Sequence, residues 1–137
     1  MTTTACAHPE PAIQKTASVV IVDDDQRVTA LLVAKLRHLG HRVAGTARNG
    51  KEAVAPVSEV RPDLVILDIN MPEMDGLQAA REIRTTCNVP IVFSTGDVED
   101  VTLAKVRGLS IGAYLVKPFS PAQLKATILL AMSPGAS

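Results

Sequence analysis

The sequence predicts a three-layer α/β sandwich, in which helices cover both faces of a parallel sheet. Short continuous apolar runs, typical of strands buried on both faces, alternate with stretches of helical periodicity. The alternation occurs five times, and strands joined through helices run parallel with right-handed crossovers. We therefore expect a doubly wound domain with five helices and a five-stranded parallel sheet of order 2-1-3-4-5.

The expected strands are the apolar runs of the chain. The clearest are SVVIVD and DLVILD, the latter announced by Pro62. VPIVFST and GAYLVK have the same continuous character, whereas the second run is weaker. The expected strands are residues 18–23, 41–46, 63–68, 89–95 and 112–117.

The expected helices show apolar spacing and recognisable ends. The first has apolar residues three or four apart and stops before Gly40. Asn49 is the expected cap of the second helix and Asp75 that of the third. Ser120 begins a capping box with Pro121 at the first helical position of the fifth. The expected helices are residues 25–39, a stretch beginning at 49, 75–86, 99–109 and 120–132.

One residue conflicts with the element in which it lies. Pro56 falls inside the second helical stretch, where proline removes a backbone donor and crowds the preceding turn. We therefore expect this helix to be kinked, to start late or to be short.

The composition is that of one globular domain. The chain has 137 residues, 47% of them hydrophobic, and a formal net charge of zero. A neutral chain has no general attraction for polyanions, so we expect no direct binding to nucleic acid or to a membrane. Cys6 and Cys87 lack metal-ligand spacing and indicate thiols in a reducing cytoplasm. We expect a flexible tail at residues 1–17, the domain at 18–132 and a short tail at 133–137, with neither a secretory signal nor a membrane span.

Polar side chains stand at the ends of four expected strands. They are the pair Asp23 and Asp24, then Asp68, Thr95 and Lys117. Because parallel strands end at one edge of a sheet, these groups are expected to meet there. Clustered carboxylates favour a hard cation such as Mg²⁺ or Mn²⁺, and a carboxylate beside it can attack phosphorus. Alone, each group has a simpler explanation as a helix cap, a strand residue or a solvated lysine.

With those residues in place, the chain resembles the receiver domain of bacterial two-component response regulators, of the chemotaxis-regulator type. The matching stretches are VIVDDD at 20–25, PDLVILDINMPEMDG at 62–76, PIVFSTG at 90–96 and AYLVKPF at 113–119. The resemblance covers residues 18–132 and implies the CheY-like, or flavodoxin-like, form of the expected fold.

The resemblance implies a role for each acidic residue. Asp68 matches the phosphoacceptor, which takes a phosphoryl group from a sensor histidine kinase or a histidine phosphotransfer protein. Asp23 and Asp24 match the acidic pair, with Asp24 the closer match to the direct Mg²⁺ ligand. The backbone carbonyl of Asn70 matches a further metal ligand. Asn70 and Asp97 match positions that tune the lifetime of the phosphoryl group.

The resemblance also implies a switch in place of an enzyme acting on outside substrates. Thr95 matches the hydroxyl that moves toward the phosphoryl group, and Lys117 matches the lysine that pairs with it. Tyr114 matches the aromatic residue that rotates as Thr95 moves, relaying the change to the surface of the fourth helix, fifth strand and fifth helix. Pro72 and Gly76 match the loop after the acceptor.

Several alternatives remain at this point. Residues 45–51 fit G-x-x-x-x-G-K of a P-loop, but Glu52 stands where a hydroxyl should bind Mg²⁺. An aspartyl phosphatase usually has a second Asp where this chain has Asn70, and a third alternative is an interaction module that is never phosphorylated. A receiver itself could be a stand-alone switch, a phosphorelay intermediate or an excised part of a larger transcriptional regulator. Its downstream target is unknown, and it could act as a monomer or as a phosphorylation-dependent homodimer.

Overall fold

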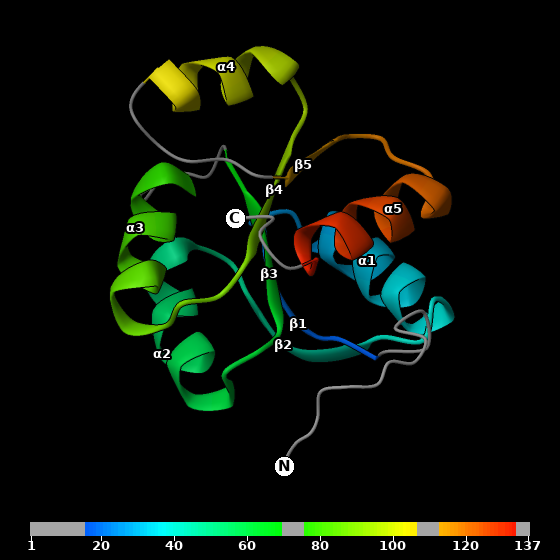
Figure 1. The fold of residues 1–137 in the computed structure, drawn as a ribbon, viewed down its shortest axis with the longest axis horizontal. Coiled ribbons are helices and arrows are strands. Elements are labelled where there is room, and N and C mark those ends of the chain that lie inside the picture. Colours follow the sequence, from blue (N-terminus) through cyan, green and yellow to red (C-terminus); the bar gives the residue numbers. More distant parts are fainter. Residues whose placement is uncertain (1–15, 70–75, 107–112, 134–137) are drawn as a thin grey trace.

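The computed structural model of the chain describes residues 16–69, 76–106 and 113–133. These residues form a three-layer α/β domain with a central parallel sheet (Figure 1). Residues 1–15 and 134–137 of the two expected tails lie outside the described residues, as do Asn70, Pro72 and the expected helix cap Asp75; Cys6 belongs to the first of these tails.

The sheet has five parallel strands in the order β2-β1-β3-β4-β5, as the sequence predicted. β3 and β4 are buried along their whole length, whereas alternate residues of β5 are exposed, as befits the last strand of the sheet. The strands are β1 Ser18–Val22, β2 Arg42–Ala47, β3 Leu64–Asp68, β4 Ile91–Thr95 and β5 Ala113–Val116.

Five helices connect and follow the strands, and their ends fall close to the expected positions. The Asp25 side chain caps the first helix by accepting from the backbone N–H of Arg27. Ser120 and Gln123 form the expected capping box of the last helix. The helices are α1 Gln26–His38, α2 Gly50–Val60, α3 Gly76–Thr86, α4 Val98–Val106 and α5 Pro121–Ala131.

The expectation that Pro56 delays or shortens α2 is wrong. The helix begins directly after its cap Asn49, whose side chain accepts from the Glu52 amide at 2.8 Å. It has 11 residues, as many as α3 and α5. Ala53 and Val57, on either side of Pro56, are fully buried, so packing offsets the lost backbone hydrogen bond. The kink stays a prediction.

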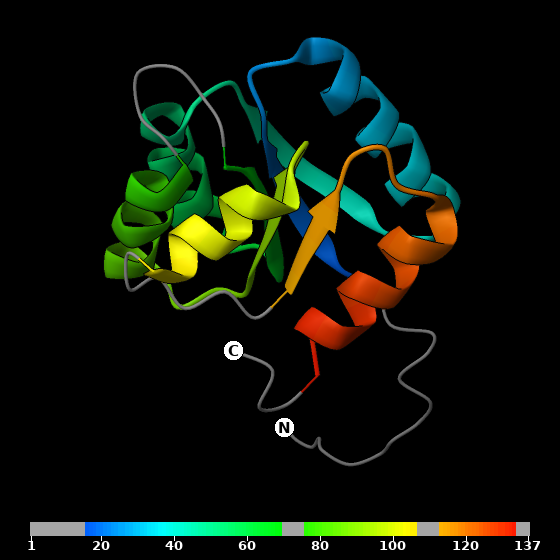
Figure 2. The same ribbon diagram turned by 90° about the horizontal axis from the view of Figure 1, so that it is seen from above.

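The hydrophobic core consists of two clusters, one on each face of the sheet. Figure 2 shows the helices that cover these faces, with α2, α3 and α4 on one side of the sheet and α1 and α5 on the other. One cluster joins β1, β3 and β4 to α2, α3 and α4 and contains Phe93. The other joins the opposite faces of those strands to α1 and α5, through residues such as Leu36 and Leu124. The sheet is therefore covered on both sides by apolar side chains, which leaves the ends of the strands as the place for a polar site.

Ala17 is packed against the domain although it belongs to the expected tail. It is fully buried, its amide donates to Nδ1 of His41 at 3.1 Å, and its carbonyl accepts from the Arg42 amide at 2.9 Å. Along the described ranges, every helix is too short or too polar to cross a bilayer.

Candidate functional site

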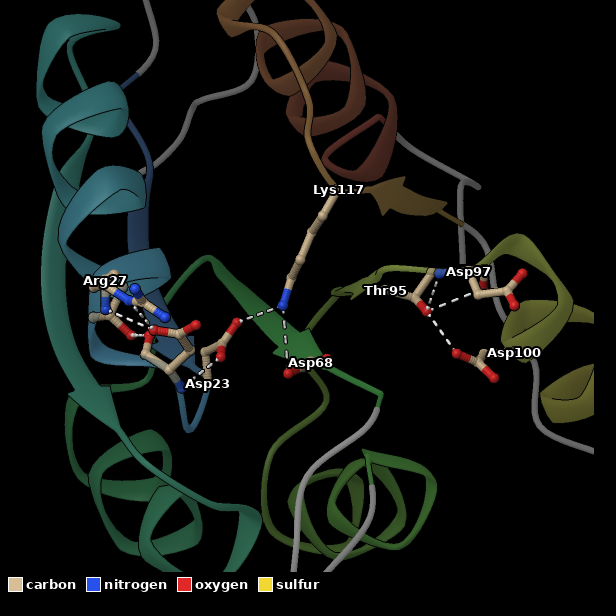
Figure 3. A network of polar contacts seen from close by, with 9 residues as sticks. Asp23, Arg27, Asp68, Thr95, Asp97, Asp100 and Lys117 are labelled. Atoms are coloured by element: carbon tan, nitrogen blue, oxygen red, sulfur yellow. Dashed lines mark hydrogen bonds and ion pairs between the residues drawn. The ribbon is translucent and has the colours of Figure 1, made fainter.

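Lys117 joins two of the predicted carboxylates at the carboxyl edge of the sheet. Asp23 directly follows β1, Asp68 is the last residue of β3, and Lys117 directly follows β5. The Lys117 ammonium lies 3.0 Å from Oδ2 of Asp23 and 3.4 Å from Oδ2 of Asp68 (Figure 3). The Lys117 amide donates to the Thr95 carbonyl at 2.7 Å, which anchors the residue beside β4. Three strand ends therefore converge on one charged cluster, as the sequence predicted.

The two carboxylates are buried. Asp23 is 2% and Asp68 4% exposed, and buried carboxylates are costly unless a counter-charge compensates them. Burial alone would lower the pKa of Lys117, but its hydrogen bond with Asp23 and the charges of Asp68 and Asp23 raise the pKa above its usual value. The ammonium is therefore held in its charged form.

The three carboxylates of the run Asp23-Asp24-Asp25 differ in position and in hydrogen-bond partner. Asp23 points inward, binding Lys117 through Oδ2 and accepting from the Asp25 amide through Oδ1 at 2.8 Å. Asp25 caps α1 through the Arg27 amide at 2.9 Å. Asp24 is exposed at the rim of the site. The third carboxylate is thus a helix cap, whereas the first two face the site.

Asp23, Asp24 and Asp68 could hold a divalent cation. One carboxylate oxygen of each lies within 4.8 Å of the others. This all-oxygen, anionic set fits Mg²⁺ or Mn²⁺ in its chemistry, and each carboxylate has several lone pairs beyond those used by its present partners. The backbone carbonyl of Asn70, the further expected ligand, lies outside the described residues.

The Thr95 hydroxyl faces the start of α4. Thr95 is fully buried, and its hydroxyl lies 3.0 Å from the Asp97 carbonyl and 2.9 Å from Oδ2 of Asp100, while it accepts from the Asp97 amide at 3.1 Å. Figure 3 shows Thr95 near the acidic cluster but turned toward Asp97 and Asp100. The sequence reasoning missed Asp100, because an acidic residue in a first helical turn usually only complements the helix dipole.

The sequence reasoning also missed Ser94. This residue is the register partner of Asp68 in the adjacent strand and is 1% exposed. Among the described buried side chains, its hydroxyl alone lacks a hydrogen-bond partner. A serine inside an otherwise apolar strand gives no sequence signal of this kind. Tyr114, the expected switch aromatic, is 39% exposed on β5, on the opposite side of β4 from Asp68.

An apolar pocket opens beside the acidic cluster. It has a volume of about 340 Å³ and lies between α1 and the segment after β5. The Lys35 ammonium closes one side, donating to the Phe119 carbonyl at 3.0 Å and lying 5.0 Å from the centre of the Phe119 ring. The lining residues are Val28, Leu31, Leu32, Lys35, Lys117, Pro118 and Phe119.

The geometry argues against a P-loop. Gly45 lies inside β2, where it is the register partner of Val20, and only Arg48 and Asn49 separate β2 from α2. Residues 45–51 therefore do not form the wide glycine-rich loop that cradles phosphates. The carboxylates at the other strand ends remain the chemical centre of the domain.

The strand order and the Asp23, Asp68 and Lys117 cluster define the class of protein: a receiver domain. The family model described as "Response regulator receiver domain" matches residues 19–129, and the chain belongs to this family.

Known proteins similar to the chain include several regulators. It is 44% identical over 114 residues to a probable transcriptional regulator, ycf27, of Guillardia theta, covering 80% of this chain and 43% of that protein. It is 39% identical to the transcriptional regulatory protein PdtaR of Mycobacterium tuberculosis, covering 84% and 56%. The signal receiver domain of a modulated diguanylate cyclase from Desulfovibrio desulfuricans superimposes with a TM-score of 0.76 at 35% identity, covering 86% and 94%. The chain thus spans about half the length of the curated relatives it matches.

Proposed function

We propose that the chain is a phosphorylation-controlled switch and that Asp68 accepts the phosphoryl group. The observation that carries the proposal is the buried pair Asp23 and Asp68 bridged by Lys117. A structural ion pair would need one carboxylate, whereas this site holds two beside the exposed Asp24. The site therefore holds carboxylates beside an ammonium in fixed positions. Phosphoryl transfer depends on fixed charges of this kind, which position the phosphoryl group and stabilise its negative charge.

In the proposed reaction, a carboxylate oxygen of Asp68 attacks the phosphorus of a phosphohistidine. An O–P bond forms, the N–P bond breaks, and its electron pair returns to the imidazole of the donor, which takes up a proton. A bound Mg²⁺ held by Asp23, Asp24 and Asp68 would neutralise charge on the phosphoryl oxygens. Lys117 lies 3.4 Å from Asp68 and supplies a second positive charge at the same point. The product is the phosphorylated protein, so the chain acts on no outside substrate.

The phosphoryl donor is proposed to be a sensor histidine kinase or a histidine phosphotransfer protein. The pocket between α1 and the segment after β5 supports this partner, because Lys117 lines the pocket and also contacts Asp68. Leu31 at the pocket is 59% exposed and offers apolar surface to the donor. A donor bound there lies beside the acceptor carboxylate.

The output is proposed to involve α4, β5 and α5. This side of the domain carries several exposed apolar side chains, and Tyr114 lies among them on β5. They are Val98, Leu103, Tyr114, Val116, Leu129 and Leu130. The similar ycf27 and PdtaR proteins are named as transcriptional regulators, so a role within or beside such a regulator is the favoured context.

A phosphorylation assay tests the proposal. The chain is incubated with a small acyl phosphate and Mg²⁺, and intact mass spectrometry follows the addition of a phosphoryl group. We expect the wild-type chain to be phosphorylated and Asp68→Asn to stay unmodified. Asp63→Asn, at the other end of β3, is the matched control and should be phosphorylated normally. Phosphorylation of Asp68→Asn to the wild-type level would reject Asp68 as the acceptor.

A further inference from the structure

The Thr95 hydroxyl has one hydrogen but two acceptors at the start of α4. A hydroxyl donates once, so the Asp97 carbonyl and the Asp100 carboxylate compete for that hydrogen. The carboxylate is charged and lies at 2.9 Å against 3.0 Å for the carbonyl, and hydrogen bonds to charged acceptors are the stronger ones. Thr95 is fully buried, so water does not readily replace either partner.

We propose that Asp100 is a positioning residue that holds the Thr95 hydroxyl away from the acceptor site in the unphosphorylated protein. The inference rests on the proposed function, in which Thr95 turns toward a phosphoryl group on Asp68. Because the hydroxyl cannot donate to both, the phosphoryl group must displace Asp100. Asp100 therefore lowers the affinity of the site for a phosphoryl group, and its release is coupled to the first turn of α4.

The adjacent residue Glu99 provides a matched control for this role. Both acidic residues lie in the first turn of α4, so both complement the helix dipole and both add negative charge near the site. Of these two carboxylates, the Asp100 side chain contacts the Thr95 hydroxyl, whereas Glu99 is exposed and its amide donates to the Asp97 side chain. An effect of charge alone would appear in both substitutions, whereas the proposed contact would appear in one.

The test measures binding of beryllium fluoride with Mg²⁺, a stable mimic of the phosphoryl group on a carboxylate, by fluorine NMR. The variants are Asp100→Ala, Asp100→Asn and Glu99→Ala, each made with Thr95 present and with Thr95→Ala. Circular dichroism melts verify that each variant is folded, and Asp100→Asn serves if the alanine variant is not.

We expect Asp100→Ala to bind the mimic about fivefold more tightly, which corresponds to about 1 kcal/mol, because the Thr95 hydroxyl loses its charged acceptor and keeps only the neutral Asp97 carbonyl. Asp100→Asn keeps a neutral acceptor and should give a smaller gain, about twofold. In the Thr95→Ala background, substitution of Asp100 should change nothing, because the hydroxyl is absent.

Three results would overturn the role of Asp100: unchanged or weaker binding by its variants, an equal gain from Glu99→Ala, or a gain that persists without the Thr95 hydroxyl. Failure of the proposed function looks different. In that case the wild-type chain does not bind the mimic, or Asp68→Asn binds it equally well.

Discussion

Replacement of Lys117 by methionine should destabilise the domain at neutral pH through a mechanism that can be read from the site. Methionine keeps much of the side-chain volume but removes the ammonium that lies 3.0 Å from Asp23 and 3.4 Å from Asp68. Two carboxylates, 2% and 4% exposed, then lose the ammonium that bridges them. Removing one partner of a buried ion pair costs about 3–5 kcal/mol, because a charge is left buried and unpaired.

The lower end of that range applies here. The Lys117 side chain is 24% exposed, so water enters the space near the carboxylates when the ammonium is removed. We therefore expect Lys117→Met to lower the free energy of unfolding by about 3 kcal/mol. With a urea m-value of about 2 kcal/mol per M, the midpoint should fall by about 1.5 M. The assay is urea unfolding followed by circular dichroism, without added divalent cations.

Two further variants decide whether the charge is the cause. Lys125→Met removes an exposed lysine of α5 and should change stability by less than about 0.5 kcal/mol. Adding Asp23→Asn to Lys117→Met should restore part of the loss, because it removes one of the two facing charges and its amide oxygen can still accept from the Asp25 amide. The reasoning is refuted if Lys117→Met costs less than about 1 kcal/mol, or if Asp23→Asn makes that variant less stable still.

Three other predictions use the same urea assay. Ser94→Ala should raise stability by about 0.5–1 kcal/mol, because it removes a buried hydroxyl without a hydrogen-bond partner; a loss above about 1 kcal/mol would show that the hydroxyl is satisfied in solution. Arg61→Gly should raise stability by about 0.5 kcal/mol, because Arg61 ends α2 with a left-handed φ of 46° that glycine adopts without strain; a loss would mean that the Arg61 side chain matters more than its backbone. Burial lowers the pKa of His41 below its ordinary value of 6.5, so the unfolded chain binds a proton more readily and stability should fall as pH drops below about 6.5. His41→Asn keeps an acceptor near Nδ1 for the Ala17 amide and should weaken this pH dependence, and an unchanged pH profile would contradict the assignment.

The architecture was predictable because the strand sequences reflect burial on both faces of the sheet. The runs VVIV, LVIL and IVF are apolar on both sides of the strand, which only a sheet covered on both faces accommodates. Pro56 shows where local reasoning fails. Pro56 removes a backbone hydrogen bond from α2, but the neighbouring Ala53 and Val57 are packed in the core and stabilise the helix. This tertiary packing cannot be read from the local sequence.

The sequence predicted those residues of the site whose position depends only on the order and direction of the strands. Asp23, Asp68 and Lys117 converge because each stands at the carboxyl end of a parallel strand. The orientation of the Thr95 hydroxyl was not predictable, because it depends on the path of the loop that brings Asp100 back toward β4. Side-chain rotamers and contacts between loop residues leave no periodic trace in a sequence.

Tyr114 on β5 can serve as an intrinsic fluorescence probe. The chain has one tyrosine and no tryptophan, so its intrinsic ultraviolet emission arises almost wholly from this side chain. Tyr114 is the register partner of Phe93, sits one strand away from Thr95, and is only partly exposed. A change in quantum yield or quencher access therefore reports on the surroundings of this one side chain on β5. Events at the carboxyl edge of the sheet that reach β5 can be timed without attaching a dye.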